Sequence, residues 1–422
     1  MEFVELHEKI PKIAHYPLIV AGGGVAGVAA ALAARRAGIK VLLIEKSVKI
    51  GGLATLGLIN YFVPMCNGRG KQIIFGMAEE LLRLSIRYGY DSIPAGWEDG
   101  KELKLQSTAR YATRYDPEIF SLALTELLIG EGVEILYDSI VVRSIMEGNH
   151  CRGIVTENKS GRSYYGADVV IDATGDADIL RRSGVPVAER GNYYIMVGKM
   201  ISLDTCKTAV ETGNIRNAIS AVSGGRVNLY GKNQPRDIPL FYGTNADDVN
   251  RMMILNQLEM LRKLKDNNRR SRSVVTLPGM PQFRTVCRMV GDYVLQEADV
   301  FHHFEDSVGA VNDFDHRDAL YEIPYRTLVN RNFDNLITAG RSASAEGYAW
   351  DVIRVIPPAI ITGQAAGNAA ALAIEGGCAV ADIEIKELQR RLREQNVMIH
   401  FDDSLIPAEA VTFNDHAAGD EV

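Results

Sequence analysis

The sequence predicts an α/β fold: a three-layer domain with a parallel central sheet and a β-meander, joined to a smaller α+β domain. At 422 residues the chain exceeds what one ordinary core holds, which favours two domains. Residues 16–21 form an apolar run with the length of a buried strand. The alanine-rich stretch 25–37 follows as a helix, and 40–44 as a second strand. Strand, helix and strand in this order are the unit from which parallel sheets are built.

The turn between the first strand and the helix carries a G-x-G-x-x-G motif at Gly22, Gly24 and Gly27. In a dinucleotide site the first glycine permits the turn, the second admits the pyrophosphate, and the third lets helix and strand pack closely. The helix N-terminus offers N–H groups and the positive end of its dipole to the phosphates. Glu45 ends the second strand, 18 residues after Gly27, where an acid can accept hydrogen bonds from a ribose. The complete order favours a dinucleotide site over a plain glycine-rich turn.

Composition and charge exclude several other classes of protein. The net charge of −7 and the pI of about 5.7 argue against nucleic-acid binding as the main activity. The five cysteines are dispersed without a C-x-x-C pair, which indicates a reducing compartment and no structural metal. The N-terminus does not resemble a signal peptide, and no apolar run reaches the roughly 18 residues of a membrane helix. We therefore expect a cytoplasmic protein without nucleic-acid or membrane partners.

The segment after Glu45 combines loops and helices. A glycine pair, Gly51 and Gly52, lets the backbone pass close to a bound cofactor. Residues 56–70 are apolar yet contain glycines and a proline, which suits a loop over a ring system. Within them Cys66 has no histidine or second cysteine nearby in sequence, so a buried, inert thiol is favoured over a nucleophile. Helices are expected over 72–88 and 116–132, the latter capped by Asp116, and strands over 133–137, 140–143, 153–156 and 163–165.

A third apolar strand, 167–173, ends in Ala173, Thr174 and Gly175. Open α/β sheets place ligands at this carboxyl end of their strands. Beyond residue 185 the βαβ pattern stops. A long helix is expected over 249–265, with a core-facing stripe of Met252, Leu255, Leu258, Leu261 and Leu264.

A second helical stretch is expected around residues 282–293. It would place Arg284 and Arg288 one turn apart, where they either grip an anionic group or pair with acids of their own fold. The basic run 267–272 favours a solvated turn.

The final third returns to a nucleotide-binding pattern. Residues 335–339 form a strand that ends in Gly340 and Arg341. A helix begins near residue 354, with prolines at its start and small residues along its body that permit close packing. Its N-terminus is a second positive end, suited to a ring carbonyl that gains charge on reduction.

Together these pieces resemble the FAD-dependent oxidoreductases of the glutathione-reductase-like class with two dinucleotide folds, related to thiazole-synthase-like and tRNA-modifying flavoproteins. The matching residues follow the family's order over nearly the whole chain: 22–27, Glu45, 51–55, 171–176, 321–326, 335–341 and 354–367. The tRNA-modifying relatives carry a basic C-terminal RNA-binding region. Here the chain after Asp382 is short and ends acidic, which argues against that branch.

The resemblance implies a Rossmann-like FAD-binding domain in two parts, 1–185 and 328–385, a substrate or cap domain at 186–327, and a C-terminal tail at 386–422. It also implies FAD in an extended pose. The pyrophosphate would meet the glycine turn and the adenosine ribose Glu45. The flavin would lie along the 51–55 loop, and Val142 would meet the adenine through its backbone. Gly340, Arg341 and the helix start at 357–363 would meet the pyrophosphate and the isoalloxazine. The implied FAD-binding residues are Gly22, Gly24, Val25, Ala26, Gly27, Glu45, Lys46, Gly52, Leu53, Ala54, Thr55, Val142, Ala173, Thr174, Gly175, Gly340, Arg341, Ile356, Pro357 and Ala359.

One position departs from the family pattern. Many relatives have Gly-Asp where this chain has Gly340 and Arg341. An arginine–phosphate contact is the candidate replacement for the usual carboxylate contact to the ribityl chain.

The leading hypothesis is a flavoenzyme that transfers a hydride between FAD and a small organic substrate, with a nicotinamide or oxygen as electron partner. Tyr348 and Asp351 stand just before the flavin-facing helix and are the favoured proton-handling residues. His302 is a further catalytic candidate, although the pair His302 and His303 also fits a plain surface position. His316 and Tyr325 complete the set. The alternatives are a non-catalytic FAD-binding redox sensor and an NAD-dependent dehydrogenase; the sequence leaves the substrate and the oligomeric state open.

Overall fold

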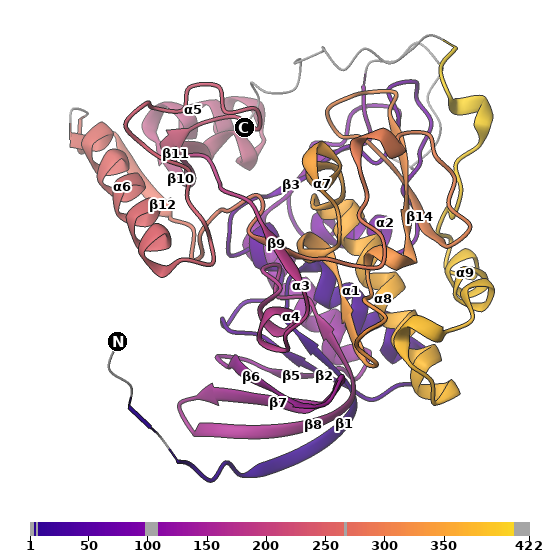
Figure 1. Cartoon of the computed structure of the whole chain (residues 1–422). Coiled ribbons are helices and arrows are strands. Elements are labelled where there is room, and N and C mark those ends of the chain that lie inside the picture. The colour runs from indigo at the N-terminus through magenta and orange to yellow at the C-terminus, as the bar shows by residue number, and fades with distance from the viewer. Residues whose placement is uncertain (1–3, 6, 98–108, 266–267, 409–422) are drawn as a thin grey trace.

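The computed structural model describes residues 4–5, 7–97, 109–265 and 268–408. Its centre is a seven-stranded sheet in the order β5-β2-β1-β8-β7-β6, with β16 paired to β8 (Figure 1). The pairs β1–β2, β1–β8, β2–β5 and β8–β16 are parallel, whereas β6, β7 and β8 form an antiparallel meander. The strands are β1 (Lys12–Ala21), β2 (Val41–Ile44), β5 (Glu134–Leu136), β6 (Ile140–Glu147), β7 (His150–Asn158), β8 (Gly161–Asp172) and β16 (Leu336–Thr338). The predicted parallel sheet with a meander is confirmed.

Strand β8 is longer than the sequence pattern indicated. The expected strands at 163–165 and 167–173 are one continuous strand of twelve residues. Its first half pairs with β7 in the meander, and its second half lies between β1 and β16. One strand therefore joins the meander to the parallel sheet.

Each face of the sheet buries its own apolar cluster. Along β1, Leu18 and Val20 pack into one cluster while Ile19 and Ala21 pack into the other, as the two-residue strand period requires. Helices cover the first face: α1 (Val25–Arg36), α2 (Met77–Ile86), α3 (Pro117–Gly130), α7 (Gly347–Ile353) and α8 (Ile356–Gly376), with α9 (Ile385–Glu394) beyond α8. The meander and α4 (Asp178–Arg182) contribute to the cluster on the second face. Helices, sheet and meander make the three predicted layers.

Small residues set the close packing of α1 against α8. A Cβ atom added to Gly363 would lie 2.2 Å from the carbonyl oxygen of Ala26, and one added to Gly367 would lie 2.2 Å from that of Ala30. These distances leave no room for a side chain, so the two helices approach backbone to backbone. The predicted role of small residues along α8 is confirmed.

The middle of the chain forms a separate antiparallel unit, seen at the upper left of Figure 1. Its sheet has the order β11-β10-β12 and packs against α6. A two-stranded ribbon of β9 and β13 leads back to the first part of the molecule, which is the part built around the seven-stranded sheet. The elements are β9 (Val187–Glu189), β10 (Ile195–Ser202), α5 (Leu203–Thr212), β11 (Ser220–Arg226), α6 (Ala246–Lys265), β12 (Arg272–Thr276) and β13 (Cys287–Met289).

The chain then returns to the first core well before residue 327. Leu295, Phe304, Val308 and Tyr321 belong to the same buried cluster as the helices α1 and α8. The segment carries the hairpin β14 (Ser307–Asn312) and β15 (Leu320–Pro324), while β3 (Tyr61–Phe62) and β4 (Thr113–Arg114) pair elsewhere on this part. The domain limits at 185 and 327 remain predictions.

Three helix predictions need correction. Around 282–293 the chain forms β13 instead of a helix, because Cys287 to Met289 pair with β9. Helix α2 begins at Met77, since its N-cap Gly76 has φ +65°, a left-handed conformation that excludes the preceding residues from the helix. In α6 the predicted stripe holds only in part: Met252 is buried and Leu255 and Leu264 pack against core clusters, whereas Leu258 and Leu261 are exposed.

Other predictions hold or fall outside the described residues. The N-cap role of Asp116 is confirmed, because its carboxylate accepts from the backbone N–H groups of Glu118 and Ile119. Cys66 is buried as expected, and burial raises the pKa of its thiol. Parts of the basic run 267–272 and of the acidic C-terminus lie outside the described residues. Over the described part of the chain, none of the helices has the length and apolar character needed to span a membrane.

Candidate cofactor and active site

A cleft opens at the carboxyl ends of four parallel-sheet strands. Ala21 at the end of β1, Ile44 on β2, Ala173 after β8 and Ala339 after β16 all line it. Its empty volume is about 1190 Å³, including the part open to solvent. This is the edge of an open α/β sheet at which ligands bind.

The glycine turn shows three different environments. Gly22 has φ +105°, and a Cβ atom on it would lie 2.4 Å from the carbonyl oxygen of Ala173. A Cβ atom on Gly27 would lie 1.8 Å from the carbonyl oxygen of Gly22. By contrast, a Cβ atom on Gly24 would have no atom within 4 Å apart from those of the adjoining chain. Gly22 and Gly27 therefore serve the packing of the turn, and Gly24 presents bare backbone to the cleft at the N-cap of α1.

Glu45 fixes the glycine turn to the end of β2. One carboxylate oxygen accepts from the backbone N–H of Gly23 (2.7 Å), and the other accepts from that of Ser47 (2.8 Å). The side chain is buried, yet it still lines the cleft together with Lys46. A carboxylate has about four acceptor sites, so capacity remains for ligand hydroxyl groups.

The second glycine loop lies directly on the first. The backbone N–H of Gly51 donates to the carbonyl of Gly23 (2.7 Å), and Gly52 lines the cleft. The Thr55 hydroxyl donates to the carbonyl of Ile50 (2.7 Å), so this side chain braces its own loop and lies outside the described cleft lining. Leu53 and Ala54 line the cleft as expected, and the sequence reading missed Leu56 beside them.

At the start of β6 the cleft is lined by Val141 instead of Val142. The pairing of β6 with β7 shifts between Val141 and Arg143, so Val142 has no partner on β7 in the register of this pair. Ser139 and Ile140 also line this end. A bulge of this kind reverses which side chain of a strand faces a site, and it leaves no mark in the sequence.

The end of β8 is held by a buried carboxylate. Asp172 accepts from the backbone N–H groups of Ile179 (2.8 Å) and Leu180 (3.0 Å) at the start of α4, and from the Thr174 hydroxyl (2.7 Å). Burial raises the pKa of Asp172 to about 6. Thr174 and Gly175 beyond it line the cleft with Ala173.

Arg341 connects three segments around the cleft. Its guanidinium donates to the carbonyls of Gly175 (2.8 Å) and Phe283 (2.7 Å) and to the carboxylate of Asp176. The side chain is buried, and its charge is balanced by Asp176. In this structure Arg341 thus acts mainly as a crosslink, while Gly340, with φ +78°, lines the cleft beside Ala26.

The start of α8 closes the other wall of the cleft. Ile356 and Ala359 line it, and Pro357 lies buried behind them. Because Pro357 and Pro358 carry no backbone N–H, Ile356 supplies the single N–H among the first three residues of the helix. The N-terminus of α8 therefore offers fewer N–H donors to a ligand than the sequence pattern implied.

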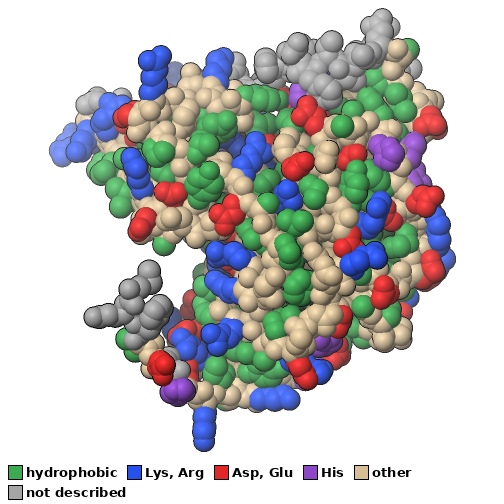
Figure 2. All heavy atoms as spheres, viewed as in Figure 1, with side chains coloured by type: hydrophobic (Ala, Val, Ile, Leu, Met, Phe, Trp, Pro, Cys, Tyr) green, Lys and Arg blue, Asp and Glu red, His purple; other side chains and the backbone are tan. Residues whose placement is uncertain are grey.

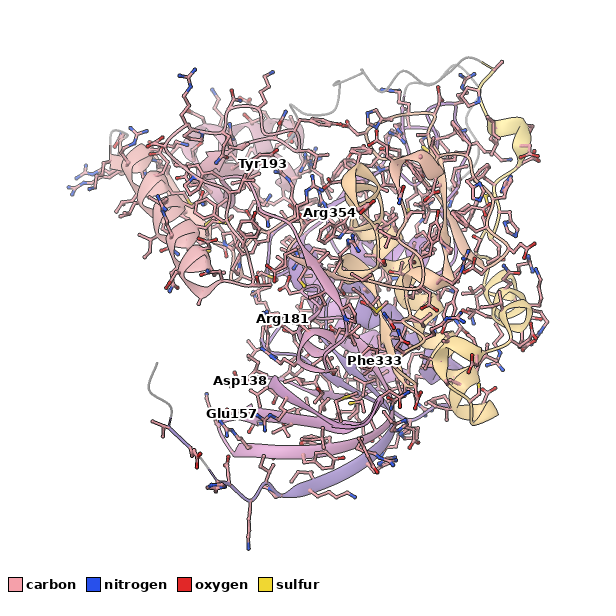
Figure 3. The ribbon with its side chains drawn as sticks, in the orientation of Figure 1. Asp138, Glu157, Arg181, Tyr193, Phe333 and Arg354 are labelled. Atoms are coloured by element: carbon pink, nitrogen blue, oxygen red, sulfur yellow. The ribbon has the colours of Figure 1, made fainter. Side chains whose placement is uncertain are left out.

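An arginine cluster lies where the cleft meets the middle unit, and the sequence indicated only Arg284 of its members as a possible anion ligand. Arg284 and Arg354 line the cleft, and Figure 3 places Arg354 where that unit meets the first part, with Tyr193 across from it. Arg354 donates to one oxygen of Asp351 (2.7 Å), and Arg190 donates to the other (2.8 Å). Asp351 is 2% exposed.

Arg284 differs from the other two arginines. Its guanidinium donates to the carbonyls of Val227 (3.0 Å) and Asn228 (3.1 Å), and among the described residues no carboxylate forms an ion pair with it. Burial, followed by the charge of Arg354, lowers the pKa of Arg284 to about 10. Arg288, its expected partner, points elsewhere: it stacks over Trp350 and reaches Glu346.

The predicted proton-handling residues lie at separate places. The Tyr348 hydroxyl donates to Asp313 (2.8 Å), and burial together with that carboxylate raises the pKa of Tyr348. His316 contacts the other oxygen of Asp313 (3.0 Å). His302 is exposed, packs against Phe304 and lies outside the described cleft lining, and its catalytic role stays a prediction.

Comparison with known proteins identifies the family. The model of a family described as FAD dependent oxidoreductase matches residues 17–193 and 202–392. The chain belongs to the FAD-dependent oxidoreductase family. This confirms the flavoenzyme resemblance and selects FAD over a nicotinamide as the cofactor.

Individual relatives of this FAD-dependent oxidoreductase are distant. Thioredoxin reductase from Ureaplasma parvum serovar 3 is 30% identical over 77 residues, 18% of this chain and 25% of that reductase, so the match spans a quarter of its length. A geranylgeranyl bacteriochlorophyll reductase-like structure from Thermoplasma acidophilum is 14% identical, with a TM-score of 0.44, covering 93% of this chain and 95% of the other. The p-nitrophenol 4-monooxygenase PnpA from Pseudomonas putida DLL-E4 is 14% identical, with a TM-score of 0.41, covering 93% and 91%.

The cleft fits a flavin dinucleotide. Gly24 leaves open space where a pyrophosphate needs to approach backbone N–H groups at a helix N-terminus. Glu45 keeps acceptor capacity beside that turn. The lining includes Ser139 before β6 as well as Arg354 before α8, so segments far apart in the chain supply walls for a long two-part ligand.

Proposed function

We propose that this FAD-dependent oxidoreductase transfers a hydride between FAD and a small organic anion. The observation that carries the proposal is the arginine cluster at one end of the cleft. The guanidinium groups of Arg190 and Arg354 share the carboxylate of Asp351, and that of Arg284 lies close enough for the charge of Arg354 to lower its pKa. Positive charge is therefore in excess in a partly buried place, and a carboxylate or phosphate on the substrate would balance it.

The cofactor would be held by the residues that the family resemblance implied. We propose that the backbone of the 22–27 turn faces the pyrophosphate and that Glu45 accepts from the adenosine ribose. The loop 52–54 and the start of α8 would flank the isoalloxazine, which supplies hydride transfer when FAD is bound. Val141, not Val142, is the residue that we propose for the adenine end, because it is the one in the cleft lining.

Arg284 and Arg354 would orient the substrate anion. A guanidinium binds a planar carboxylate through two parallel hydrogen bonds, which fixes orientation as well as position. Asp351 is a positioning residue in this proposal, since both of its oxygens are occupied by arginines and neither is available as a base.

The middle unit would cover the site and exclude water. Gln282 donates to the carbonyl of Gly57 (2.7 Å), and the N–H of Gly279 donates to that of Leu56 (3.0 Å). These bonds hold the segment with Met280 and Arg284 over the loop that follows Ala54.

The test uses protein reconstituted with FAD under anaerobic conditions. Flavin absorbance is followed while 2-hydroxy acids, dicarboxylates and phosphorylated alcohols are added, each paired with its neutral amide or alcohol. We expect the anions alone to reduce the flavin, and reduced protein to be reoxidised by a nicotinamide or by oxygen. In Arg284→Met the concentration for half-maximal reduction rate should rise at least tenfold with FAD affinity unchanged, and exposed Arg226→Met serves as control. The proposal would be contradicted if the neutral compounds reduced the flavin, or if none of the compounds did. The second result would favour a redox sensor.

A further inference from the structure

Two partly exposed histidines and a buried glutamate meet in the first part of the molecule. His303 follows the short helix at Glu297–Asp299, Glu322 lies on β15, and His400 follows α9. The possible ligand atoms of the three side chains all lie within 4.8 Å of one another. They lie outside the described lining of the cofactor cleft.

We propose that His303, Glu322 and His400 form a binding site for one divalent transition-metal ion, best matched by Zn²⁺. Imidazole nitrogen and carboxylate oxygen are ordinary zinc ligands at about 2.0–2.2 Å. Two His ligands with one carboxylate leave a fourth position for water. The site goes beyond the flavin chemistry and does not depend on the proposed substrate.

The separations between the ligand atoms are close to those of a metal shell. The Nδ1 atom of His303 lies 2.5 Å from one oxygen of Glu322, and the Nδ1 atom of His400 lies 3.0 Å from the other. Ligands of a tetrahedral zinc ion stand about 3.3 Å apart, which follows from the bond lengths. The imidazoles need to retreat by less than 1 Å. Both side chains have room to do so, because they are 39% and 37% exposed.

The carboxylate is the fixed point of the site. Glu322 is fully buried, and its carboxylate also accepts from the backbone N–H of Phe304 (2.8 Å). A buried carboxylate needs strong partners, and a cation between two neutral imidazoles would supply one. The neighbouring strand pairing of β14 and β15 holds its backbone.

A second carboxylate supports the histidine ring from behind. The Nε2 atom of His303 lies 2.8 Å from the carboxylate of Asp403. Metal-bound histidines commonly donate their other N–H to a carboxylate, which fixes the ring orientation and raises ligand basicity. The His303 ring also lies against Phe401, with centroids 4.4 Å apart.

The other histidine–carboxylate contacts lack this arrangement. His15 with Asp168 and His316 with Asp313 each join one ring to one carboxylate. Over the described ranges of the chain, the cluster of His303, Glu322 and His400 is the single group of three such side chains whose ligand atoms meet. His15 therefore offers a matched control.

A metal at this place would clamp the C-terminal segment onto the hairpin. That segment already bonds to β14: the Ser307 hydroxyl donates to the carbonyl of Ile399 (2.6 Å), and the N–H of Ala310 donates to that of Met398 (2.7 Å). The ion would add a third link through His400. We therefore assign the site a structural role.

The experiment uses full-length, tag-free protein with its flavin bound. After EDTA treatment and desalting, Zn²⁺ is titrated by calorimetry, and Co²⁺ is added to a second sample for its visible absorption. We expect one ion per chain with a Kd of 10 μM or tighter, and a higher thermal midpoint with Zn²⁺. His400→Ala should weaken binding at least 100-fold, and Asp403→Asn by about 10–100-fold.

The control and the variants decide the result. His15→Ala should bind Zn²⁺ like the unaltered chain, with the same flavin content. If His400→Ala does not fold, exposed Asp403→Asn still tests the site, because its carboxylate side chain is 80% exposed. A Kd weaker than about 1 mM in the unaltered chain, or equal affinities in it and in Asp403→Asn and His400→Ala, would overturn the proposal.

Discussion

Gly24 offers the sharpest test of how the cofactor is held. Its backbone has φ −65° and ψ 171°, a conformation open to every residue, and a Cβ atom there meets no atom within 4 Å apart from those of the adjoining chain. Gly24→Ala should therefore leave the folded apoprotein intact. It should even raise the free energy of unfolding by about 0.4–1 kcal/mol, because the unfolded chain loses conformational freedom.

The same methyl group would occupy the space that we propose for the pyrophosphate. A hydrogen bond to a charged group contributes about 1.5–3 kcal/mol. Losing one or two of them corresponds to about 1.5–6 kcal/mol, or roughly a 10- to 20,000-fold weaker Kd for FAD at 1.4 kcal/mol per tenfold change. Titration of apoprotein with FAD, followed by the quenching of flavin fluorescence, measures this Kd, and thermal unfolding of the apoprotein measures stability.

Gly27→Ala is the matched contrast. Its Cβ atom would lie 1.8 Å from the carbonyl oxygen of Gly22, so the turn itself must move and the apoprotein should lose about 1–3 kcal/mol or more. If Gly24→Ala binds FAD as tightly as the unaltered chain, the pyrophosphate does not approach this backbone, and the proposed cofactor pose is refuted.

Three further changes test the fold and the site. Gly367→Ala should lower the free energy of unfolding in urea by about 1–3 kcal/mol through its clash with Ala30, whereas Gly130→Ala, in open space at the end of α3, should raise it by up to about 1 kcal/mol. Burial lowers the pKa of Lys199 to about 8, below the unfolded value near 10.4, so the unfolded state binds more protons between these pH values. Stability should rise with pH across that window, and Lys199→Met should remove the rise in thermal midpoints. Asp351→Asn leaves two arginines without their shared carboxylate and should cost about 3–5 kcal/mol in urea unfolding.

Each of these tests has an outcome that contradicts it. Equal stabilities of the two glycine variants would mean that α1 and α8 do not pack backbone to backbone. If the thermal midpoint changes between pH 8 and 10 by the same amount in the unaltered chain and in Lys199→Met, Lys199 does not contribute to the pH dependence. A fully stable Asp351→Asn protein that has lost activity would return this carboxylate to a catalytic role.

Local backbone requirements explain why the first half of the site could be predicted from sequence. The positions of Gly22 and Gly27 are dictated by contacts of 2.4 Å and 1.8 Å that exclude any side chain, so the residue type records the geometry. Glu45 bonds to Gly23, only 22 positions away, within one βαβ unit. The small residues of α8 report close helix packing in the same direct way.

The rest of the site depends on partners that are far apart in the chain. The segment expected as a helix near Arg284 is extended because Cys287 to Met289 pair with Val187 to Glu189, about a hundred positions earlier. Arg190 and Asp351 meet across 161 positions. Neither pairing leaves a periodic signal in the sequence, and the bulge that selects Val141 over Val142 leaves none either.

Charge balance gives Arg341 and Arg284 different roles. Arg341 is neutralised by Asp176 and spends further N–H groups on two carbonyls, so it contributes little net attraction to a ligand phosphate. Arg284 has only carbonyl partners among the described residues, and its charge is left for a ligand. If that ligand were the cofactor's own pyrophosphate, Arg284→Met would weaken FAD binding, as Gly24→Ala should. A variant that keeps FAD but loses its response to organic anions would place the charge on the substrate side instead, and the two variants together therefore divide the cleft into its cofactor and substrate ends.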